Sequence, residues 1–595
     1  MCAIFGIIGK YKRDTAIKNF SKLSHRGMDD SHFIEVENCF FGIHRLAIET
    51  FESELNQPFL NGKYLAVFNG EIYNYKEIAL EFGISAKSEI EVIVKCYEKF
   101  GDNFVELLEG MFAIAIYDGS TLRLFRDRAG KKPLYFTFDG ESFSFASEIK
   151  ALKNNSEINS DMLLEYLSFQ TTISPKTFFN KIYSLSASST LVFDGQNVQI
   201  YSYFNPLNNN VIYKDKKSAI LAVEKVLKES VKKRLPNKNI PYGALLSGGL
   251  DSSLVAAIAS QYEKIDTFCM GYEDKFISYD ERKYAQMTAE HIGSNHHEAI
   301  LTKDKFFDTL EMFDLLFDEP LGDPAAVPLY VLLNEVKKSG KRVVLGGDGS
   351  DELFFGYSRY REFYDIENIS KLKNKNWLKN YFRSNYSINK EWEWYKRALE
   401  ESIVFRSSSE LFTDLQQNRL LKKNVKDDHS LEAILPHWEE YKRSGRNDIL
   451  DWYSFCDMKI RLGELYLKKL DMVSMACQVE VRSPFLDSSM INTAFGIEGR
   501  LRLGDTNKDI IKDIATKYLP DTVINRKKRG FSYPYMEWLL EENALELIKK
   551  VQSKHKIFHE EHLNAMLNKV DSGGFKNQIF AIYMYCRWLE RKYAL

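Results

Sequence analysis

The chain contains 595 residues, 44% of them hydrophobic, and its 81 lysines and arginines nearly balance its 83 aspartates and glutamates. The high apolar content excludes a mainly disordered chain, and a formal charge of −2 excludes a general polyanion-binding surface such as one for nucleic acids. At roughly 100–200 residues per domain, the length allows two to about five domains.

Seven cysteines are spread along the chain, and none of them belongs to a CxxC pair. An odd number of widely spaced cysteines is typical of reduced thiols in a cytosolic protein and not of a disulfide framework or a zinc ribbon. The N-terminus places an apolar stretch before its basic residues, the reverse of a secretory signal, and no charge-free apolar run of about 20 residues occurs. We therefore expect a soluble, cytoplasmic protein without a membrane span.

Residues 1–204 predict a strand-rich domain. Helical patterns are limited to residues 74–82 and 88–100, and the other apolar segments are short and separated by turn residues. The expected strands cover residues 2–9, 39–48, 63–68, 111–118, 121–127, 133–138 and 142–147. This pattern indicates an α+β domain with two or more packed sheets.

A polar, asparagine-rich segment at residues 204–216 is the expected linker. Beyond it strands alternate with helices, including a helix near 326–338, which predicts a parallel sheet covered on both faces. From residue 361 to the end the patterns are mainly helical. We therefore predict two units, residues 1–204 and 216–595, of which the second is an α/β domain with a helical C-terminal part.

Cys2 is a candidate nucleophile because it follows the initiator methionine. Removal of Met1 would leave a thiol and a free α-amine on one residue, and an α-amine with a pKa near 8 can accept the thiol proton directly or through water. The alternative is a small apolar residue that starts a buried strand. Taken alone, the position of Cys2 favours that alternative.

Three further segments place charged or amide groups beside strand ends: HRG at 25–27, HRLAIE at 44–49 and FNGEIYNY at 68–75. Together with Cys2, they resemble the glutaminase domain of class II glutamine amidotransferases, which are N-terminal-nucleophile hydrolases. This resemblance implies an αββα fold for residues 1–204. It also implies that Cys2 attacks the side-chain amide of glutamine.

The resemblance assigns further roles in the same domain. The Asn69 side chain and the Gly70 backbone N–H would form the oxyanion hole, where fixed donors can supply several kcal/mol. Arg45 would grip the glutamine α-carboxylate with its bidentate fork. The remaining glutamine contacts would come from Leu46, Ile48, Glu71 and Glu89, with the two glutamates facing the α-ammonium group.

The chain departs from this family's usual pattern at three positions. Ala3 stands where the family usually has glycine, Met28 where it has proline, and Glu89 where it has aspartate. None of these changes removes a required functional group. We therefore expect glutaminase activity to be intact.

The segment ALLSGGLDSS at 244–253 is the most specific motif of the chain. An apolar strand leads into two glycines and then a helix, an arrangement in which backbone N–H groups and serine hydroxyls bind phosphate oxygens. The segment lacks the GxxxxGK[ST] pattern of a Walker A loop. It resembles instead the pyrophosphate loop of enzymes that split ATP between its α and β phosphates and adenylate a substrate. The implied contacts are Ser247, Gly248, Gly249 and Ser252.

Four more segments resemble the synthetase domain of asparagine synthetases: residues 317–330, 343–357, 468–487 and 525–534. This second resemblance extends over nearly the whole chain, and residues 361–450 match it least. It implies that Asp251 and Asp351 hold Mg²⁺ on the pyrophosphate oxygens, since Mg²⁺ prefers oxygen ligands. Asp348 would act near the acyl-adenylate, and Glu352 is another candidate there. The implied adenosine contacts are Leu245, Met270, Gly346 and Gly347, and the implied phosphate contacts are Lys469 and Lys528.

These resemblances predict a glutamine-dependent asparagine synthesis with ATP as substrate, in which ammonia passes between two sites. Glutamine, aspartate and ATP would be the small-molecule partners, without a nucleic acid or membrane partner. One alternative keeps the chemistry and amidates another carboxylate, such as a sugar acid in surface-glycan synthesis. A second alternative is a non-catalytic sensor of glutamine or ATP. The oligomeric state cannot be read from the sequence, and a homodimer is one option.

Overall fold

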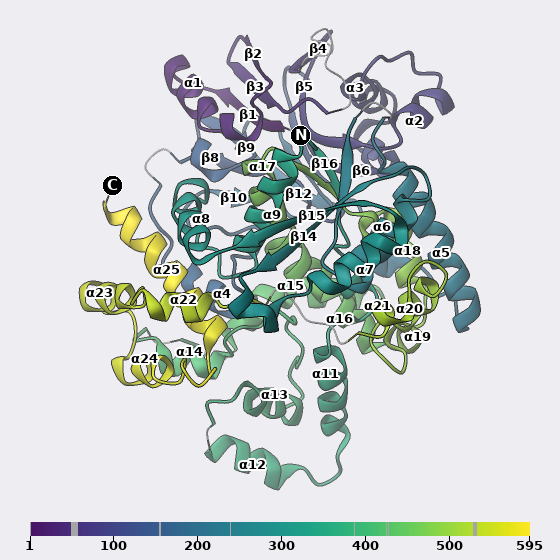
Figure 1. Ribbon diagram of the computed structural model, residues 1–595. Helices are drawn as coiled ribbons and strands as arrows, with labels where there is room; N and C mark the ends of the chain where they lie inside the picture. The colour runs from purple at the N-terminus through teal and green to yellow at the C-terminus, as the bar shows by residue number, and fades with distance from the viewer. Residues whose placement is uncertain are drawn as a thin grey trace.

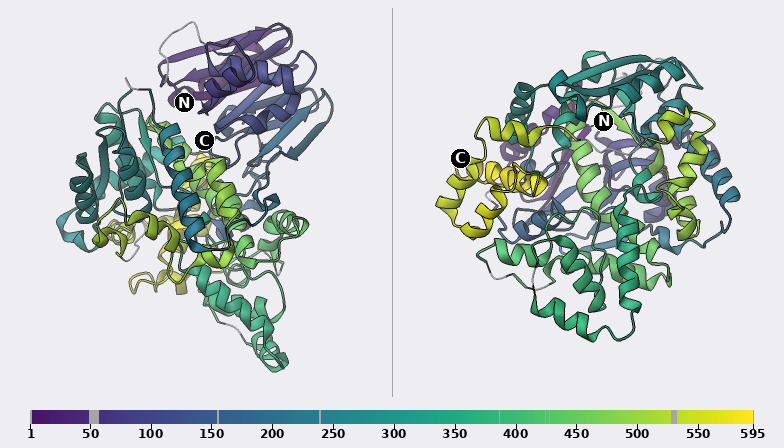
Figure 2. Two further views of the ribbon diagram at one scale, coloured as in Figure 1. Left: turned by 90° about the vertical axis from the view of Figure 1, so that its right-hand side faces the viewer. Right: turned by 60° about the horizontal axis from the view of Figure 1, so that its bottom comes forward.

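The computed structural model describes residues 2–48, 57–153, 156–237, 240–385, 387–423, 425–426, 428–526 and 532–594. The N-terminal part forms a lobe of two antiparallel sheets, and the remaining chain surrounds a parallel sheet (Figure 1). Figure 2 shows this lobe at one end of the molecule and a projecting arm of helices at the other.

The two antiparallel sheets have the strand orders β10-β8-β9-β1-β3-β2 and β12-β11-β7-β6-β5-β4. The first sheet consists of β1 (Cys2–Gly9), β2 (Asp30–Val36), β3 (Cys39–Arg45), β8 (Tyr135–Phe138), β9 (Ser142–Ala146) and β10 (Tyr183–Ser184). The second consists of β4 (Phe59–Asn61), β5 (Tyr64–Ile72), β6 (Gly110–Tyr117), β7 (Leu122–Arg126), β11 (Ser189–Phe193) and β12 (Val198–Ser202).

Alternation along the strands sorts the side chains of this lobe into layers. Ile4 and Val67 belong to the core between the two sheets. Every second side chain of a strand points into this core, because successive side chains point to opposite faces of a sheet. The opposite faces are covered by α1 (Arg13–Ser21), whose Phe20 contacts the ring of Phe40, and by α3 (Glu89–Phe100), which shares a core with Phe68. The result is the αββα arrangement that the resemblance implied, with α3 at a predicted place. Helix α1 was not predicted, because only three of its nine residues are buried and its apolar periodicity is weak. The helix at Met162–Phe169 was not predicted either.

The second sheet system is fully parallel, in the order β15-β14-β13-β16-β17. Its strands are β13 (Tyr242–Leu245), β14 (Asp266–Tyr272), β15 (Asn295–Leu301), β16 (Val343–Leu345) and β17 (Glu480–Arg482). The helices α6 (Leu250–Ala259) and α7 (Arg282–Ile292) pack together, as do α8 (Lys303–Leu316), α9 (Ala326–Lys338) and α17 (Lys468–Ala476). This parallel sheet confirms the predicted α/β class.

Strand β17 is the one element of this sheet that the sequence patterns did not indicate. It lies in the predicted helical part, and its three residues are too few to show a strand period. The Gly346 N–H donates to the Arg482 carbonyl at 2.8 Å, so β17 brings the residues after 482 beside the loop that follows β16.

The rest of the chain is mainly helical, as predicted from residue 361 onward. A continuous helix runs through α16 (Ile449–Asp457), the π-helical segment η8 (Met458–Leu467) and α17. The other helices before residue 358 are α2 (Tyr75–Glu81), α4 (Met162–Phe169), α5 (Lys216–Lys233) and α10 (Ser350–Leu353). Those after it are α11 (Arg359–Glu367), α12 (Asn376–Ser384), α13 (Lys390–Leu399), α14 (Asp414–Leu420), α15 (His429–Arg443), α18 (Ser488–Phe495), α19 (Gly499–Leu503), α20 (Asp509–Ala515), α21 (Asp521–Ile524), α22 (Tyr535–Glu541), α23 (Glu546–His555), α24 (Glu560–Leu567) and α25 (Lys576–Ala594). Among the described residues, no helix combines the length and apolarity that crossing a membrane requires.

Candidate active site

Cys2 and Asn69 meet between the two antiparallel sheets. Cys2 begins β1 and is 8% exposed, and its backbone nitrogen donates to Asn69 Oδ1 at 3.0 Å. Asn69 Nδ2 is buried and has no acceptor within the described ranges. A buried donor left unpaired costs about 1–3 kcal/mol, so this amide is suited to an anionic oxygen that forms beside Cys2.

Gly70 follows Asn69 at a point where β5 leaves no room for a side chain. A Cβ atom at this position would overlap the Met111 carbonyl oxygen of the neighbouring strand β6. Glycine therefore allows β5 and β6 to stay paired while Asn69 faces Cys2.

Arg45 is directly opposite Cys2 in the register of β1 and β3. Residues opposite one another in an antiparallel pair project from the same face, so the Arg45 side chain starts on the face that carries the thiol. Leu46 and Ile48, which follow Arg45, are 3% and 4% exposed. The structure thus brings these three predicted glutamine contacts to the Cys2 end of the sheet.

The three departures from the usual family pattern leave this site unobstructed. Ala3 is fully buried in a core on the face of β1 opposite to Cys2, so its methyl group points away from the thiol. Met28 is 69% exposed. Glu89 accepts a hydrogen bond from the Ile72 backbone nitrogen at 2.6 Å, so part of its carboxylate holds the end of β5.

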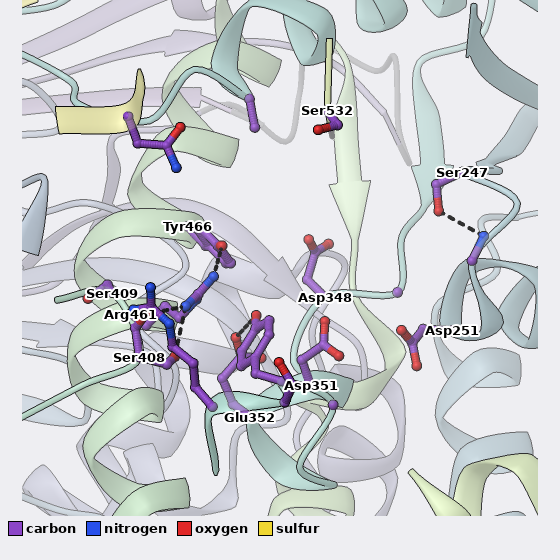
Figure 3. Close-up of a pocket in the computed structure, with 18 of the residues that line it drawn as sticks. Ser247, Asp251, Asp348, Asp351, Glu352, Ser408, Ser409, Arg461, Tyr466 and Ser532 are labelled. Atoms are coloured by element: carbon purple, nitrogen blue, oxygen red, sulfur yellow. Dashed lines mark hydrogen bonds between the residues drawn. The ribbon is translucent and has the colours of Figure 1, made fainter. Parts of the chain in front are cut away.

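The loop between β13 and α6 has the shape expected of a phosphate-binding loop. Gly248 has a φ of +68°, which favours glycine, and Gly249 caps α6. The Ser247 and Ser252 hydroxyls lie 3.0 Å apart, and the Gly249 N–H donates to Ser247 Oγ at 3.2 Å (Figure 3). Hydroxyls and helix N-terminal N–H groups therefore face the same space at the start of α6.

Asp251 and Asp351 converge on one ammonium group. Lys508 Nζ lies 2.5 Å from Asp351 Oδ1 and also binds Asp251, whose other oxygen accepts from Ser350 Oγ at 2.6 Å. Burial alone would lower the pKa of Lys508, but the two carboxylates outweigh it and raise that pKa. The two predicted metal ligands are thus close enough to share one cation.

A cavity of about 1450 Å³ extends from the phosphate-binding loop past these carboxylates. Lys469 lines it and pairs with Asp323 at 2.5 Å. Lys528, the second predicted phosphate contact, lies outside the described residues. The predicted nucleotide and metal residues that line the cavity are Leu245, Ser247, Gly249, Asp251, Ser252, Met270, Gly346, Gly347 and Asp351.

Asp348 lines the same cavity and is linked to the N-terminal lobe. Ser483 Oγ lies 3.2 Å from Asp348 Oδ2 and accepts from Lys131 Nζ at 2.7 Å. Burial lowers the pKa of Lys131 to about 7, although the negative charge of Asp348 opposes this shift. A residue of the N-terminal lobe therefore reaches the carboxylate side of the cavity.

Buried ion pairs join the two halves of the chain near this link. Asp471 of α17 lies 2.6 Å from Arg26 Nη2 and 2.9 Å from Lys132 Nζ, and both cations belong to the N-terminal lobe. Burial acts to raise the pKa of Asp471, but the two cations lower it overall. Glu71 of β5 also reaches across, 3.5 Å from the Arg482 guanidinium.

Two protein families match successive parts of this chain. Residues 1–204 match the glutamine amidotransferase domain family, and residues 222–590 match the asparagine synthase family. The chain belongs to the asparagine synthase family. It is therefore an enzyme of the glutamine-hydrolysing asparagine synthetase type, as the resemblance implied.

The curated relatives described below match between 62% and 100% of this chain. The chain is 28% identical to glutamine-hydrolyzing asparagine synthetase 1 of Bacillus subtilis, over 100% of this chain and 98% of that protein. It is 30% identical to a putative asparagine synthetase of Mycobacterium tuberculosis, over 88% of this chain and 84% of that protein. A putative asparagine synthetase 2 of Methanocaldococcus jannaschii is 32% identical over 62% and 78% of the two chains.

Two solved structures each cover half of this chain. The allosteric regulatory enzyme of purine biosynthesis has a TM-score of 0.29 at 14% identity, covering 50% of this chain and 80% of its own. The glutamine phosphoribosylpyrophosphate amidotransferase of B. subtilis has a TM-score of 0.26 at 15% identity, covering 50% and 66%. At these scores the overlap supports no conclusion about the present chain.

Four residues of the site were not anticipated from the sequence: Lys131, Ser483, Lys508 and Arg526. Arg526 donates to the Gly248 carbonyl at 2.8 Å, on the phosphate-binding loop. It lies within the recognised segment 525–534 that also contains Lys528, and membership of that segment was the only available signal. Ser483 lies in the recognised segment 468–487, but nothing in that segment indicates its contact with Lys131, 352 positions away. Lys131 and Lys508 lie outside the recognised segments, and Lys508 reaches Asp251 across 257 positions.

Proposed function

We propose that this enzyme makes L-asparagine, converting ATP, L-aspartate, L-glutamine and water into AMP, diphosphate, L-asparagine and L-glutamate. The observation that supports this most is the presence in one chain of the Cys2–Asn69 pair and of a phosphate-binding loop with two convergent carboxylates. The glutaminase unit would span residues 1–204 and the synthetase unit residues 216–595. The protein would act in the cytoplasm on small molecules, as a homodimer or a single chain.

In the glutaminase unit, the Cys2 sulfur would bond to the side-chain carbonyl carbon of glutamine, and its proton would pass to the α-amine exposed by removal of Met1. Asn69 Nδ2 and the Gly70 N–H would stabilise the oxyanion. The tetrahedral intermediate would then expel ammonia, whose nitrogen takes the proton back from the α-ammonium group, and leave a thioester. Water would hydrolyse this thioester, releasing glutamate and restoring the thiol. Arg45 would bind the α-carboxylate of glutamine. The remaining glutamine contacts would be Leu46, Ile48, Glu71 and Glu89.

In the synthetase unit, the loop from Ser247 to Ser252 would bind the phosphates of ATP, and the acceptor carboxylate would attack the α phosphorus and release diphosphate. Asp251 and Asp351 fit Mg²⁺, because their oxygens already converge on one cation and Mg²⁺ is commonly held by one or two carboxylates together with phosphates. Mg²⁺ bound there would neutralise phosphate charge. Asp348 would accept a proton from the ammonia that attacks the acyl-adenylate.

Ammonia made at Cys2 has to reach this adenylate before it is protonated in water. We propose that it passes within the protein, between the two units. The buried contacts that join Arg26 and Lys132 to Asp471, and Lys131 to Ser483, support this because they exclude bulk solvent from part of the boundary.

The proposal is tested by following diphosphate and glutamate release with aspartate and either glutamine or ammonium as nitrogen donor. Cys2→Ala should abolish the glutamine-dependent reaction and leave the ammonium-dependent one intact. Cys96→Ala, another buried cysteine that lies in α3, is the matched control and should retain both. A Cys2→Ala enzyme that still used glutamine would refute the glutaminase assignment. Diphosphate release with a uronate but not with aspartate would refute the assignment of aspartate as the acceptor.

A further inference from the structure

Three basic side chains converge at the end of the cavity that lies away from the phosphate-binding loop. Arg359 begins α11, Lys390 begins α13, and Arg461 lies in η8. All three line the cavity that also contains the nucleotide residues. We call Arg359, Lys390 and Arg461 the basic cluster.

The backbone between Ser408 and Glu410 holds the basic cluster together. The Ser408 carbonyl accepts from Arg461 at 2.8 Å and from Arg359 at 3.3 Å, and the Glu410 carbonyl accepts from Lys390 at 2.8 Å. The three cations thus bind neighbouring carbonyl groups, although they come from three separate elements.

No carboxylate within the described ranges comes within 4.0 Å of the three cationic groups. Of the two glutamates that act on Arg359 and Lys390 from the cavity wall, Glu391 and Glu410, the second directs its carboxylate to Arg397 at 2.8 Å and to the Trp394 indole nitrogen at 2.6 Å. Within the described ranges, Arg359 and Lys390 thus meet carbonyl groups and no ion-pair partner. Arg461 also donates to the Ser408 and Tyr466 hydroxyls, and burial is outweighed there by nearby negative groups, including Asp457 and Glu352, which raise its pKa.

This arrangement is electrostatically unfavourable in the absence of a ligand. Burial, followed by the charge of Arg359, lowers the pKa of Lys390 to about 7, and burial, followed by the charge of Arg461, lowers the pKa of Arg359. The charges of Glu410 and Glu391 oppose both shifts without reversing them, so an anion placed beside Arg359 and Lys390 would relieve the remaining repulsion.

A series of contacts connects the basic cluster to the predicted metal ligand Asp351. Arg461 lies over the Tyr357 ring, 4.0 Å from its centroid, and the Tyr357 hydroxyl donates to Glu352 at 2.7 Å. Glu352 neighbours the predicted metal ligand Asp351. Figure 3 shows Arg461 on one side of these carboxylates and Ser247 on the other.

The phosphates of ATP have their own cations at the loop end, so they leave the basic cluster unneutralised. The cavity of about 1450 Å³ also exceeds the roughly 300–1,000 Å³ typical of a ligand site, which leaves room for an acceptor beyond the nucleotide. We propose that the basic cluster is an anion subsite that binds a second negatively charged group of the acceptor, distinct from the carboxylate that is activated. This inference rests on the proposed function for the identity of the ligand as an acceptor.

The ligand chemistry is that of a carboxylate or phosphate group, which arginine and lysine bind by charge-assisted hydrogen bonds. Two sources are compatible with it: the α-carboxylate of aspartate, or an anionic group on a longer acceptor. The experiment below separates these sources after establishing the subsite.

The first measurement is a calorimetric titration with inorganic phosphate at constant ionic strength. Mg²⁺ and α,β-methylene-ATP are present at saturation, so the phosphate-binding loop is already occupied. Arg359→Gln and Lys390→Gln, on different helices, should each weaken phosphate binding by about 10- to 100-fold, as expected for the loss of one charge-assisted hydrogen bond. Arg383→Gln removes an exposed arginine of α12 that pairs with Glu400, and it should bind phosphate as the wild type does.

Nucleotide affinity, measured on the same variants, shows that the fold is intact, because Arg359 and Lys390 do not contact the loop. Wild-type enzyme that binds no phosphate under these conditions would overturn the proposal. So would either variant with unchanged phosphate affinity. This outcome is independent of the proposed reaction, because it requires no turnover.

The second measurement identifies the source of the anion. If the KM for aspartate in diphosphate release rises in Arg359→Gln and Lys390→Gln at unchanged ammonium affinity, the α-carboxylate occupies the basic cluster. If the KM for aspartate stays constant while phosphate binding is lost, the natural acceptor is longer than aspartate. Failure of the wild type to release diphosphate with any acceptor would refute the proposed function and leave the phosphate result standing.

Discussion

The side-chain nitrogen of Asn69, which has no acceptor among the described residues, leads to a quantitative prediction about glutamine hydrolysis. Asn69 Oδ1 accepts from the Cys2 nitrogen at 3.0 Å, whereas Nδ2 is buried without an acceptor among the described residues. Asn69→Asp preserves the oxygen that holds the amine and replaces only the donor. Loss of one oxyanion-hole donor lowers kcat by about 10²–10³-fold, or about 2.7–4 kcal/mol, and the added negative charge increases this loss.

Asn69→Ala removes the oxyanion donor and also the oxygen that accepts from the Cys2 nitrogen. The second loss adds about 0.5–1.5 kcal/mol. Asn74 offers a matched control, since its side chain donates to the Leu107 carbonyl at 2.9 Å and accepts from the Glu109 nitrogen at 2.8 Å. Asn74→Ala should alter stability more than kcat.

The assay is glutamate release at saturating glutamine, with ammonium-dependent diphosphate release as the internal standard. Both Asn69 variants should lose the first activity and retain the second. The reasoning would be refuted if Asn69→Asp kept the wild-type kcat, or if only its KM for glutamine changed, because a donor to the oxyanion acts in the transition state.

Three further predictions concern folding and the boundary between the units. Asp471→Asn should lower the free energy of unfolding in urea by about 3–5 kcal/mol, because the Arg26 guanidinium loses a buried carboxylate; a loss below about 1 kcal/mol, as for an exposed pair, would contradict this. Lys131→Met should raise the free energy of unfolding at pH 7, and the gain should shrink toward pH 10, because the folded-state pKa is about 7 while an unfolded lysine stays protonated to about 10.4. Wild-type stability therefore rises with pH in that window, and equal gains measured at both pH values would rule out a depressed pKa. Gly70→Ala should abolish glutamate release but not ammonium-dependent turnover, since its Cβ would overlap the Met111 carbonyl; full glutaminase activity would show that β5 can shift.

Short contiguous motifs made much of the site predictable. The segment from Ala244 to Ser253 combines a strand end, two glycines and a helix start, and all of these act through local backbone geometry. Asn69 and Gly70 are neighbours in one strand, and Cys2 is defined by its place at the N-terminus. The α+β class with packed sheets and the parallel sheet were likewise predictable, because strand alternation and strand–helix alternation are local periodicities. The αββα arrangement was implied only by the family resemblance.

The residues that complete the site depended on long-range placement. Lys508 binds Asp251 across 257 positions, and Lys131 reaches Ser483 across 352. Strand β17, three residues long, carries no periodic signal, yet its pairing with β16 places Ser483 beside Asp348.

The sequence by itself predicted the two chemistries, since the candidate nucleophile, the candidate oxyanion donor and the predicted phosphate-binding loop each lie in a short segment with a recognisable pattern. The tertiary structure decided what surrounds them: the lysine between two carboxylates, the buried ion pairs that join the units, and the basic cluster at the far end of the cavity. The physical reason is that a motif acts through neighbouring backbone groups, whereas an ion pair or a cation cluster depends on topology, which brings together side chains from distant elements and sets how deeply they are buried.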